Sequence, residues 1–375
     1  MNSKALDKNK LTEFLKKEII LIIAIMLAII TSFISTPKLS YINFKDLILL
    51  FNLMVVITGL KEFKLLDYIG TRLLHHDKSL KRIYSVMIFL TFFSSMLITD
   101  DVALITFVPL SIILAKKANF NPVKLIVFQT IAAITGCSLT PMGSSQNLYI
   151  FTHFNLTSSQ FFAITIPITI VSFLLLVGFV IFQKNKTFDV SLEEVVIEKK
   201  HLIGIYLILF LVVLASVFHL VNYKYAFAAV IIITLIIDKK LFLKVDYSLL
   251  LTFTAFFIFI GNVATIPSVK TVISGLLVND VHTYFIGLGM SQVISNVPAT
   301  LLLSPFTHNY RALLLGVNNG GLFSLIGSMA SIISYKFALS SKKTTTGKYV
   351  GVFVLYSLVS LVVLVPTSYI IIKFI

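Results

Sequence analysis

The sequence predicts an all-α membrane protein that crosses the bilayer many times. Of its 375 residues, 57% are hydrophobic and 13% are charged, and the mean hydropathy is +0.97. Soluble domains hold about 45–50% apolar and about 25% charged residues. Apolar runs near the ~20 residues that cross a bilayer recur from residue 19 to residue 375. A water-soluble globule is therefore excluded, and no appreciable soluble domain is expected.

Apolar runs between charge clusters predict about nine full spans. They lie near residues 19–35, 46–60, 122–153, 158–182, 202–218, 224–237, 248–262, 309–335 and 349–372. Two further apolar segments, 83–115 and 282–306, have polar or proline-containing centres and are predicted to be re-entrant hairpins. With a cytoplasmic N-terminus, these hairpins place 25 of the 31 Lys and Arg residues on the cytoplasmic side, as the positive-inside rule requires. The formal net charge of +15 therefore indicates topology and not a nucleic-acid partner.

The order of elements predicts two inverted repeats. The first repeat is 1–182, with its hairpin at 83–115 and a broken helix at 122–153. A polar cytoplasmic linker follows at 183–201, and 202–375 then holds an extra span and the second repeat, with a hairpin at 282–306 and a broken helix at 309–335. Local similarity aligns Asp101-Val102-Ala103 with Asn296-Val297-Pro298. At a second common offset, Gly136 and Gly143 align with Gly320 and Gly327.

Among the acidic residues, only Asp100 and Asp101 are assigned to the inside of an apolar segment. Each costs about 2.5–3.5 kcal/mol on insertion scales when exposed at mid-bilayer, so both are expected to face protein or a water-filled cavity. A carboxylate in such surroundings takes up a proton or pairs with a cation, which is what coupling to an ion gradient requires. The alternative is that one Asp caps the half-helix expected to begin at Val102.

Two glycine-rich and polar stretches predict broken helices. The first runs from Gly136 to Asn147 and contains Pro141 and Gly143. The second runs from Asn318 to Ser328 and contains Gly320, Gly321 and Gly327. Unwound backbone at membrane depth is tolerated where protein buries it or where it lines a cavity, and it offers carbonyls to cations and a half-helix N-terminus to anions. The alternative is close helix packing by small residues, of the kind Gly316 and Gly320 allow.

The tip of the second hairpin has similar features without the charge. Asn296 suits the N-cap of a half-helix, and Pro298 suits its first turn, where a missing N–H costs little. The alternative is a plain helix break within a single span.

These residues together resemble the ion transporter superfamily, which includes citrate and dicarboxylate carriers, arsenite permeases and sodium/proton antiporters. The resemblance is carried by Phe93–Leu104, Thr140–Leu148 and Ser291–Ala299. It implies two inverted repeats whose hairpins and discontinuous helices meet around substrate and coupling ion, an elevator-like movement, and often a homodimer. The dicarboxylate branch carries Ser-Asn-Thr at both tips. Here the second tip is Ser295-Asn296-Val297 and the first is acidic, which resembles the arsenite-permease and antiporter branches more closely.

The expected function is secondary active transport of a small citrate-, dicarboxylate- or arsenite-like anion, coupled to protons or sodium, in the cytoplasmic membrane of a bacterium. The residues expected to bind the coupling ion are Asp100, Asp101, Thr99, Ser138 and Thr140. The residues expected to contact the anion are Ser144, Ser145, Gln146, Asn147, Ser295, Asn296, Thr300, Asn318, Asn319 and Ser324. No cofactor or structural metal is expected. The alternatives are a sodium/proton antiporter, a passive channel and an intramembrane enzyme.

Overall fold

The computed structural model describes residues 18–74, 79–183, 185–187, 195–197 and 199–374. The helices of the first half are α2 (Ile19–Ser32), η1 (Leu39–Tyr41), α3 (Phe44–Glu62), α4 (Leu65–Leu74), α5 (Leu80–Ile98), α6 (Asp100–Lys117), α7 (Val123–Gly136), η2 (Cys137–Leu139), η3 (Pro141–Gly143), α8 (Ser145–His153) and α9 (Ser158–Ile181). Those of the second half are α10 (Lys200–Val217), α11 (Tyr223–Asp238), η4 (Lys239–Lys244), α12 (Tyr247–Ala264), α13 (Pro267–Leu276), α14 (Asp280–Ile294), α15 (Asn296–Leu303), η5 (Ser304–Phe306), α16 (Tyr310–Gly320), α17 (Met329–Ser340) and α18 (Thr346–Phe374). Much of the predicted linker, together with the N-terminal lysines, lies outside the described residues.

Five helices among the described residues are long and apolar enough to cross a membrane alone: α5, α9, α10, α12 and α18. A sixth crossing results if α13 and α14, which meet at 104°, are counted as one bent span. The predicted number was about nine, and of these helices α9, α10, α12 and α18 lie in predicted spans, whereas α5 and α14 lie in the segments predicted to be hairpins. The difference arises because several predicted spans are short or divided: α2 has 14 residues, and both predicted broken helices are interrupted into pieces of 14 residues or fewer.

Side-chain caps fix where several helices begin. The Thr157 hydroxyl accepts the Gln160 N–H at 3.2 Å, and the Gln160 side chain accepts the Thr157 N–H at 2.9 Å, a capping box at the start of α9. Asp246 accepts the Leu249 N–H at 3.2 Å at the start of α12. Each cap satisfies amide groups that have no partner within the helix. The two amphipathic stretches predicted near 61–76 and 264–279 form the short helices α4 and α13.

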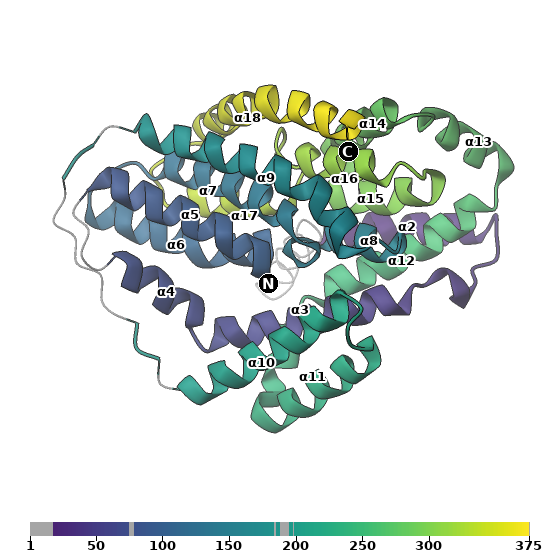
Figure 1. Ribbon diagram of the computed structural model, residues 1–375, viewed down its shortest axis with the longest axis horizontal. Coiled ribbons are helices and arrows are strands. Elements are labelled where there is room, and N and C mark those ends of the chain that lie inside the picture. Colours follow the sequence, from purple (N-terminus) through teal and green to yellow (C-terminus); the bar gives the residue numbers. More distant parts are fainter. Residues whose placement is uncertain (1–17, 75–78, 184, 188–194, 198, 375) are drawn as a thin grey trace, which may run out of the picture.

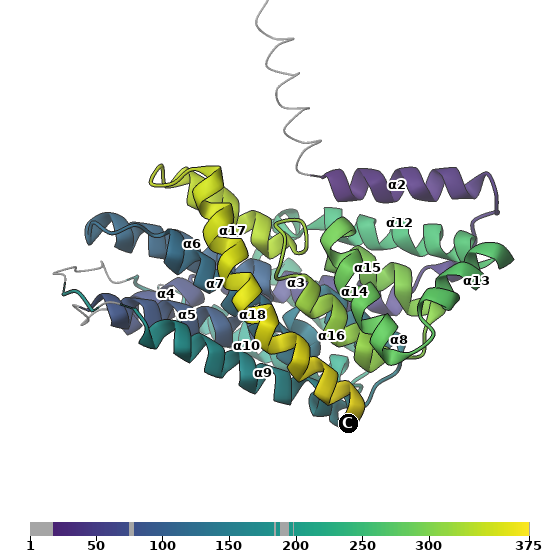
Figure 2. The ribbon, with the colours of Figure 1, turned by 90° about the horizontal axis from the view of Figure 1, so that it is seen from above.

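The helices of the two halves are interleaved. Helices α5, α6 and α7 pack together, and α14, α15 and α16 form a corresponding group toward the other end of the long axis (Figure 1). Helix α2 packs along α12 of the second half, as both views show (Figures 1 and 2). In the same manner α11 of the second half packs on α3 of the first half, with α10 beside them. Each half therefore contributes a helix to the other.

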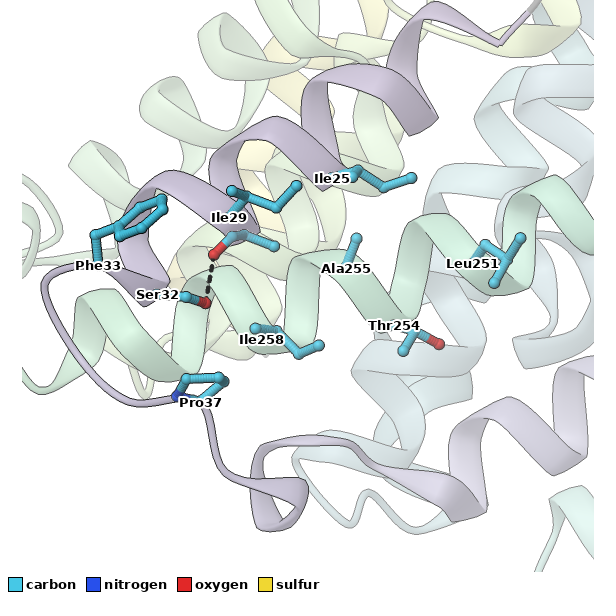
Figure 3. Close-up of a pocket in the computed structure, with 10 residues that line it drawn as sticks. Ile25, Ile29, Ser32, Phe33, Pro37, Leu251, Thr254, Ala255 and Ile258 are labelled. Carbon is cyan, nitrogen blue, oxygen red and sulfur yellow. Dashed lines mark hydrogen bonds between the residues drawn. The ribbon is translucent and has the colours of Figure 1, made fainter.

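The α2–α12 contact leaves an apolar groove of about 440 Å³, drawn in Figure 3. It is lined by Ile25, Ala28, Ile29, Ser32, Phe33, Pro37, Leu251, Thr254, Ala255 and Ile258. The only hydrogen bond drawn among these side chains runs from the Ser32 hydroxyl to the Ala28 carbonyl of the same helix, at 2.7 Å. The side of α2 that does not line the groove is equally apolar, with Met26 50% and Ile30 58% exposed. Such a surface suits a hydrocarbon surrounding.

Candidate functional site

The two hairpins turn through the same unusual backbone conformation. Thr99, between α5 and α6, has φ 73° and ψ 152°, and Ser295, between α14 and α15, has φ 74° and ψ 157°. Residues other than glycine held at positive φ cost about 1–3 kcal/mol and cluster at functional sites. Neither tip uses a glycine, although a glycine there would be free of this strain. The two tips are therefore built alike, at the polar centres predicted from sequence.

The residue that follows each turn is buried and bonds in the same way. The Asp101 N–H donates to Oδ1 of Asp100 at 3.1 Å, and the Val297 N–H donates to Oδ1 of Asn296 at 2.9 Å. The structure thus pairs Asp100 with Asn296, so the sequence alignment of Asp101 with Asn296 was wrong by one residue. The half-helix also begins at Asp100 and not at Val102. The correct register was visible as SMLITD (95–100) against SQVISN (291–296).

Each hairpin packs against a glycine in the interrupted helix of its own half of the chain. A Cβ at Gly136 would lie 2.3 Å from the Phe92 carbonyl oxygen and 2.5 Å from the Ser95 hydroxyl. At Gly320 it would lie 2.5 Å from Cβ of Ser291 and 2.9 Å from the Leu288 carbonyl oxygen. Phe92 and Ser95 stand at the same distance before Thr99 as Leu288 and Ser291 stand before Ser295. The predicted glycine alignment therefore describes equivalent contacts.

Close helix packing through small residues, the alternative interpretation of the second broken helix, is also observed in part. A Cβ at Gly316 would lie 2.4 Å from the Tyr284 carbonyl oxygen, so α16 lies close to α14 through glycine. The helix nevertheless ends at Gly320, and the chain turns without regular helix until α17 begins at Met329. Close packing and interruption therefore coexist in this segment.

A hydroxyl group in each break ties it to its hairpin. The Thr140 hydroxyl donates to the Met96 carbonyl, and the Ser324 hydroxyl donates to the Gln292 carbonyl at 3.5 Å. Each hydroxyl also accepts the N–H of the glycine three residues later, Gly143 or Gly327, at 3.0 Å. In the second half of the chain the Asn296 N–H donates to the Gly327 carbonyl at 3.0 Å. These bonds satisfy part of the interrupted backbone, which buried polar groups require.

A network of buried amides joins the two broken helices. Gln146 donates to Oδ1 of Asn318 at 3.1 Å, and Asn318 donates to Oδ1 of Asn147 at 2.8 Å. Asn147 in turn donates to the Cys137 and Thr140 carbonyls at 3.0 and 3.2 Å. The side chains of Gln146, Asn147 and Asn318 are at most 6% exposed. Both hairpins and both breaks are thereby linked into one polar centre within the apolar interior.

The acidic tip supplies the charge of this centre. Asp100 is 6% exposed, and its carboxyl group lies beside the thiol of Cys137, which in turn lies against the hydroxyl of Ser144. Oδ1 of Asp101 and the Ser144 hydroxyl are buried without a hydrogen-bond partner. Unpaired buried polar atoms are costly, and they mark places where a ligand or ion completes the pairing. Carboxylate and hydroxyl oxygens are ligands that suit hard cations, and a carboxylate also accepts a proton.

The remaining predicted site residues occupy several environments. The hydroxyls of Ser138 and Thr300 bond carbonyls of their own segments, Ile134 at 3.0 Å and Asn296 at 2.7 Å. Asn319 points elsewhere, because its amide donates to the Tyr284 and Ser368 hydroxyls, each at 2.8 Å. Ser145 and Thr99 are half-buried. Pro141 begins the 3₁₀ turn η3, Pro298 lies in the first turn of α15, and Gly321 follows the last residue of α16.

Two buried polar residues were missed by sequence reasoning, and the first of them lies beside this centre. Gln292 donates from its side chain to the Gly320 carbonyl, and its Oε1 is buried without a partner close to Gly327. Its position four residues before Asn296, beside the corrected alignment, is the signal that could have found it. Asp46 was also overlooked: it is fully buried in α3, accepts from Asn43 at 2.7 Å and keeps Oδ1 unpaired. The statement that only Asp100 and Asp101 are acidic residues within apolar segments was therefore wrong.

Apolar helices surrounding a buried polar centre, with interrupted helices and hairpin tips meeting there, define the class of integral membrane transporters. The comparisons agree with this. The family model described as citrate transporter, CitMHS, matches residues 10–312. The uncharacterized transporter MJ0456 of Methanocaldococcus jannaschii is 35% identical over 327 residues, which are 86% of this chain and 89% of that protein. The inner membrane protein YbiR of Escherichia coli (strain K12) is 26% identical over 328 residues, 86% of this chain and 87% of that protein.

A solved structure has a similar fold. The crystal structure of the Alcanivorax borkumensis YdaH transporter superposes with a TM-score of 0.58, covering 88% of this chain and 85% of that chain. The sequences are 15% identical, so this likeness concerns the fold alone. The extent of the family match shows that the chain belongs to the citrate transporter family, within the superfamily that the sequence motifs resemble. It is a multi-pass membrane protein of the transporter class.

Proposed function

We propose that the protein is a secondary active carrier that moves a small citrate-, dicarboxylate- or arsenite-like anion with coupling to protons or sodium. The observation that carries this proposal is the difference between two equivalent positions. Asp100 and Asn296 adopt the same tip geometry and the same bond to the next N–H, yet one is a carboxylic acid and the other a neutral amide. One centre thus offers a site for a cation and a site for an anion.

The coupling ion is assigned to the first hairpin. Asp100 and Asp101 supply carboxylate oxygens, and Ser144 supplies a hydroxyl, with two of these groups holding unpaired buried atoms. Binding of a cation or proton there neutralises charge that is otherwise costly to bury. Thr99 and Ser138 lie in the adjoining turn and break, and Thr140 connects this break to the hairpin.

The anion is assigned to the second hairpin and the facing break. Helix α8 begins at Ser145, and the free N–H groups of its first turn attract negative charge without a buried Lys or Arg. At α15, which begins at Asn296, the first N–H groups are already bonded, so the helix dipole and the Asn296 side chain would attract the anion. Ser295, Asn296, Asn147 and Ser324 place polar side chains there. Ser145, Gln146, Thr300, Asn318 and Asn319 are proposed to complete the lining or to support it.

The test is transport by the purified chain in proteoliposomes with imposed sodium and pH gradients. Labelled citrate, succinate and arsenite are offered separately, each with the gradient present and collapsed. Accumulation of one anion above its outside concentration, lost when one gradient is collapsed, supports the carrier and identifies its coupling ion. Equilibration without accumulation would indicate a passive channel.

A sodium/proton antiporter is the second candidate, and the observation that favours it is Asp101. A second carboxylate beside Asp100, with a buried oxygen that has no partner, provides for exchange of two cations at one tip. Added sodium should then discharge a pre-formed pH gradient, followed with a pH-sensitive dye, in the absence of any anion. If sodium discharges the pH gradient only when the anion is present, the result supports the anion carrier and not the antiporter.

The proposed orientation follows the positive-inside rule. With the N-terminus and the linker in the cytoplasm of a bacterial cell, the hairpin at 83–115 opens to the cytoplasm and the hairpin at 282–306 opens to the outside. The two repeats are then inverted, as in many secondary carriers. A homodimer is proposed as the assembly on the resemblance alone.

A further inference from the structure

A polar cavity lies at the open end of the first hairpin, at the opposite end of α5 and α6 from the tip at Thr99. It has a volume of about 530 Å³ and is lined by Leu80, Asn119, Phe120, Asn121, Lys124, Phe182, Gln183 and Lys186. These residues come from the start of α5, the α6–α7 connection, the first turn of α7 and the end of α9 with the segment after it. Helices of a membrane bundle end near the lipid headgroups, so the cavity is placed at the membrane surface.

The cavity is basic. Two of its eight described lining residues are lysines, and none of the eight is acidic. The Lys124 ammonium lies over the rings of Tyr356 and Phe128, at 5.3 and 5.6 Å from their centroids. These contacts hold the long side chain in place, and within the part of the chain that the structure describes no carboxylate forms an ion pair with it. Positive charge fixed in a cavity attracts an anionic group.

The polar walls are held by hydrogen bonds. Asn121 accepts the Val123 N–H at 3.0 Å and donates to the Lys343 carbonyl at 3.3 Å. The Lys343 ammonium in turn donates to the carbonyls of Ala115 and Phe120, at 3.3 and 3.2 Å. The loop of the second half thus fixes the connection that lines the cavity. Because this wall is already ordered, little conformational freedom of the protein would be lost when a ligand binds.

The segment that carries Lys186 is also fixed. The Leu80 N–H donates to the Lys186 carbonyl at 2.8 Å, and Ser79 pairs with Thr187 in an antiparallel bridge. The Lys186 side chain is exposed. The two cationic groups therefore come from positions 62 residues apart in sequence that the fold brings to one cavity.

The rim of the cavity is apolar. Phe182 lines it and is 85% exposed, and its neighbour Ile181 is 57% exposed. A ligand with an anionic head and hydrocarbon chains would satisfy the basic interior and the apolar rim together. A small soluble anion would leave the rim without a partner. Basic pockets between helices at the membrane surface are the usual sites of anionic lipid headgroups.

We propose that this cavity binds the phosphate-ester headgroup of an anionic phospholipid, with Lys124 and Lys186 contacting the phosphate and Phe182 contacting the acyl chains. The phosphate ester is the recognised group, and the apolar rim assigns its source to the lipid. The bound headgroup joins the segment after α9 to the base of the first hairpin and to the first turn of the broken helix α7.

The test uses the full chain in a neutral detergent. Its thermal unfolding midpoint is measured with added phosphatidylglycerol, with phosphatidylcholine at the same mole fraction, and with inorganic phosphate. Native mass spectrometry counts the lipids that remain bound. Phosphatidylglycerol should raise the midpoint and remain bound, because a ligand of the folded state stabilises it by mass action. Phosphatidylcholine carries the same phosphate ester, but Lys124 and Lys186 would repel its choline cation, so it should do neither.

The matched variants separate the cavity from general charge. Lys124→Gln with Lys186→Gln should abolish most of the lipid-dependent shift. Lys116→Gln with Lys342→Gln removes the same charge from exposed positions outside the cavity and should keep the shift. If the first pair does not fold, Lys186→Gln alone, at an exposed side chain, must still weaken the shift. The proposed site is wrong if both double variants lose the lipid-dependent shift equally, or if phosphatidylcholine raises the midpoint as much as phosphatidylglycerol does. Full stabilisation by inorganic phosphate overturns the lipid as its source.

Discussion

Asp100 and Asn296 are equivalent residues in two different hairpins. Each follows a residue at φ 73–74°, each is buried, and each accepts the N–H of the next residue on its side-chain Oδ1. The two side chains have nearly the same shape, so the backbone of either tip accommodates either residue. What distinguishes the tips is one ionisable group, which can therefore be changed with little change in structure.

Asp100→Asn should preserve folding and abolish ion-coupled uptake. The amide oxygen can accept the Asp101 N–H as Asn296 accepts that of Val297, whereas the protonatable or cation-binding oxygen is lost. Accumulation in proteoliposomes should fall by at least about tenfold, equivalent to about 1.4 kcal/mol. The unfolding midpoint should stay near that of the wild type. Unchanged gradient-driven accumulation would contradict the assigned role of Asp100.

Asp101→Asn should also remove coupling while leaving insertion and yield intact. Its buried Oδ1 has no protein partner, so the change removes a charge without breaking a hydrogen bond to that atom. The matched control is Asp280→Asn, because Asp280 is exposed at the start of α14 and the change removes the same charge far from the tip in sequence. Coupled flux and sodium-driven proton movement are measured on both variants. Loss of flux in the control as well would show that the effect is not specific to the tip.

Gly136→Ala and Gly320→Ala should each destabilise the protein. The added Cβ would lie 2.3 Å from a backbone carbonyl oxygen in the first case and 2.5 Å from Cβ of Ser291 in the second. Overpacking of this kind costs about 1–3 kcal/mol, measured as a lower thermal midpoint in detergent. Gly178→Ala and Gly204→Ala are the controls, since nothing lies within 4 Å of their added Cβ. These controls should be neutral or slightly stabilising, because Ala favours helix over Gly.

Asn318→Ala should weaken the contact between the two broken helices. It leaves the Gln146 amide without its acceptor and Asn147 Oδ1 without its donor, and each buried unpaired group costs about 1–3 kcal/mol. Thermal unfolding of Asn318→Ala, of Asn147→Ala and of the double variant forms a double-mutant cycle. The second substitution should cost less in the presence of the first. Strict additivity would show that the amides do not act as one network.

Labelling of single cysteines should place both ends of each hairpin on one side of the membrane. Cys137→Ser provides the background, because Cys137 is the only cysteine of the chain. On that background, Lys81→Cys and Lys116→Cys at the ends of the first hairpin should react with an impermeant thiol reagent from the same side. Asp280→Cys and His308→Cys should react from the opposite side. If Lys81→Cys and Lys116→Cys react from opposite sides, the segment between them crosses the membrane once. The proposed topology, in which both hairpin tips meet at one polar centre, would then be wrong.

The helical class and the positions of the interruptions follow from sequence for physical reasons. Apolar runs must form helices to satisfy their backbone within lipid, and prolines and polar residues mark where such helices end, as at Pro141 and Asn296. Long-range packing could not be predicted in the same way. The register of Asp100 depends on the turn at Thr99, and the bonds of Asn319 to Tyr284 and Ser368 depend on how α14 and α18 pack on α16.

Asp46 is a second example of packing that could not be predicted from the sequence. It stands at the start of a predicted span, where a charge usually meets water, and its burial results from packing of α3 against α8 that its own segment does not encode. Likewise, the sequence alone shows Gln292 as one polar residue in α14. Its role becomes visible only from its hydrogen bond to the Gly320 carbonyl. Such residues are found from tertiary structure.

The exchange of helices between the halves has a consequence for biogenesis. Because α2 pairs with α12 and α11 pairs with α3, the amino-terminal half leaves the ribosome with its own outer helices still lacking their final neighbours. Maturation must wait until the carboxy-terminal half has been inserted. Two separately translated fragments, divided after α9, should accordingly reconstitute a competent protein when made together and be degraded when either is made alone.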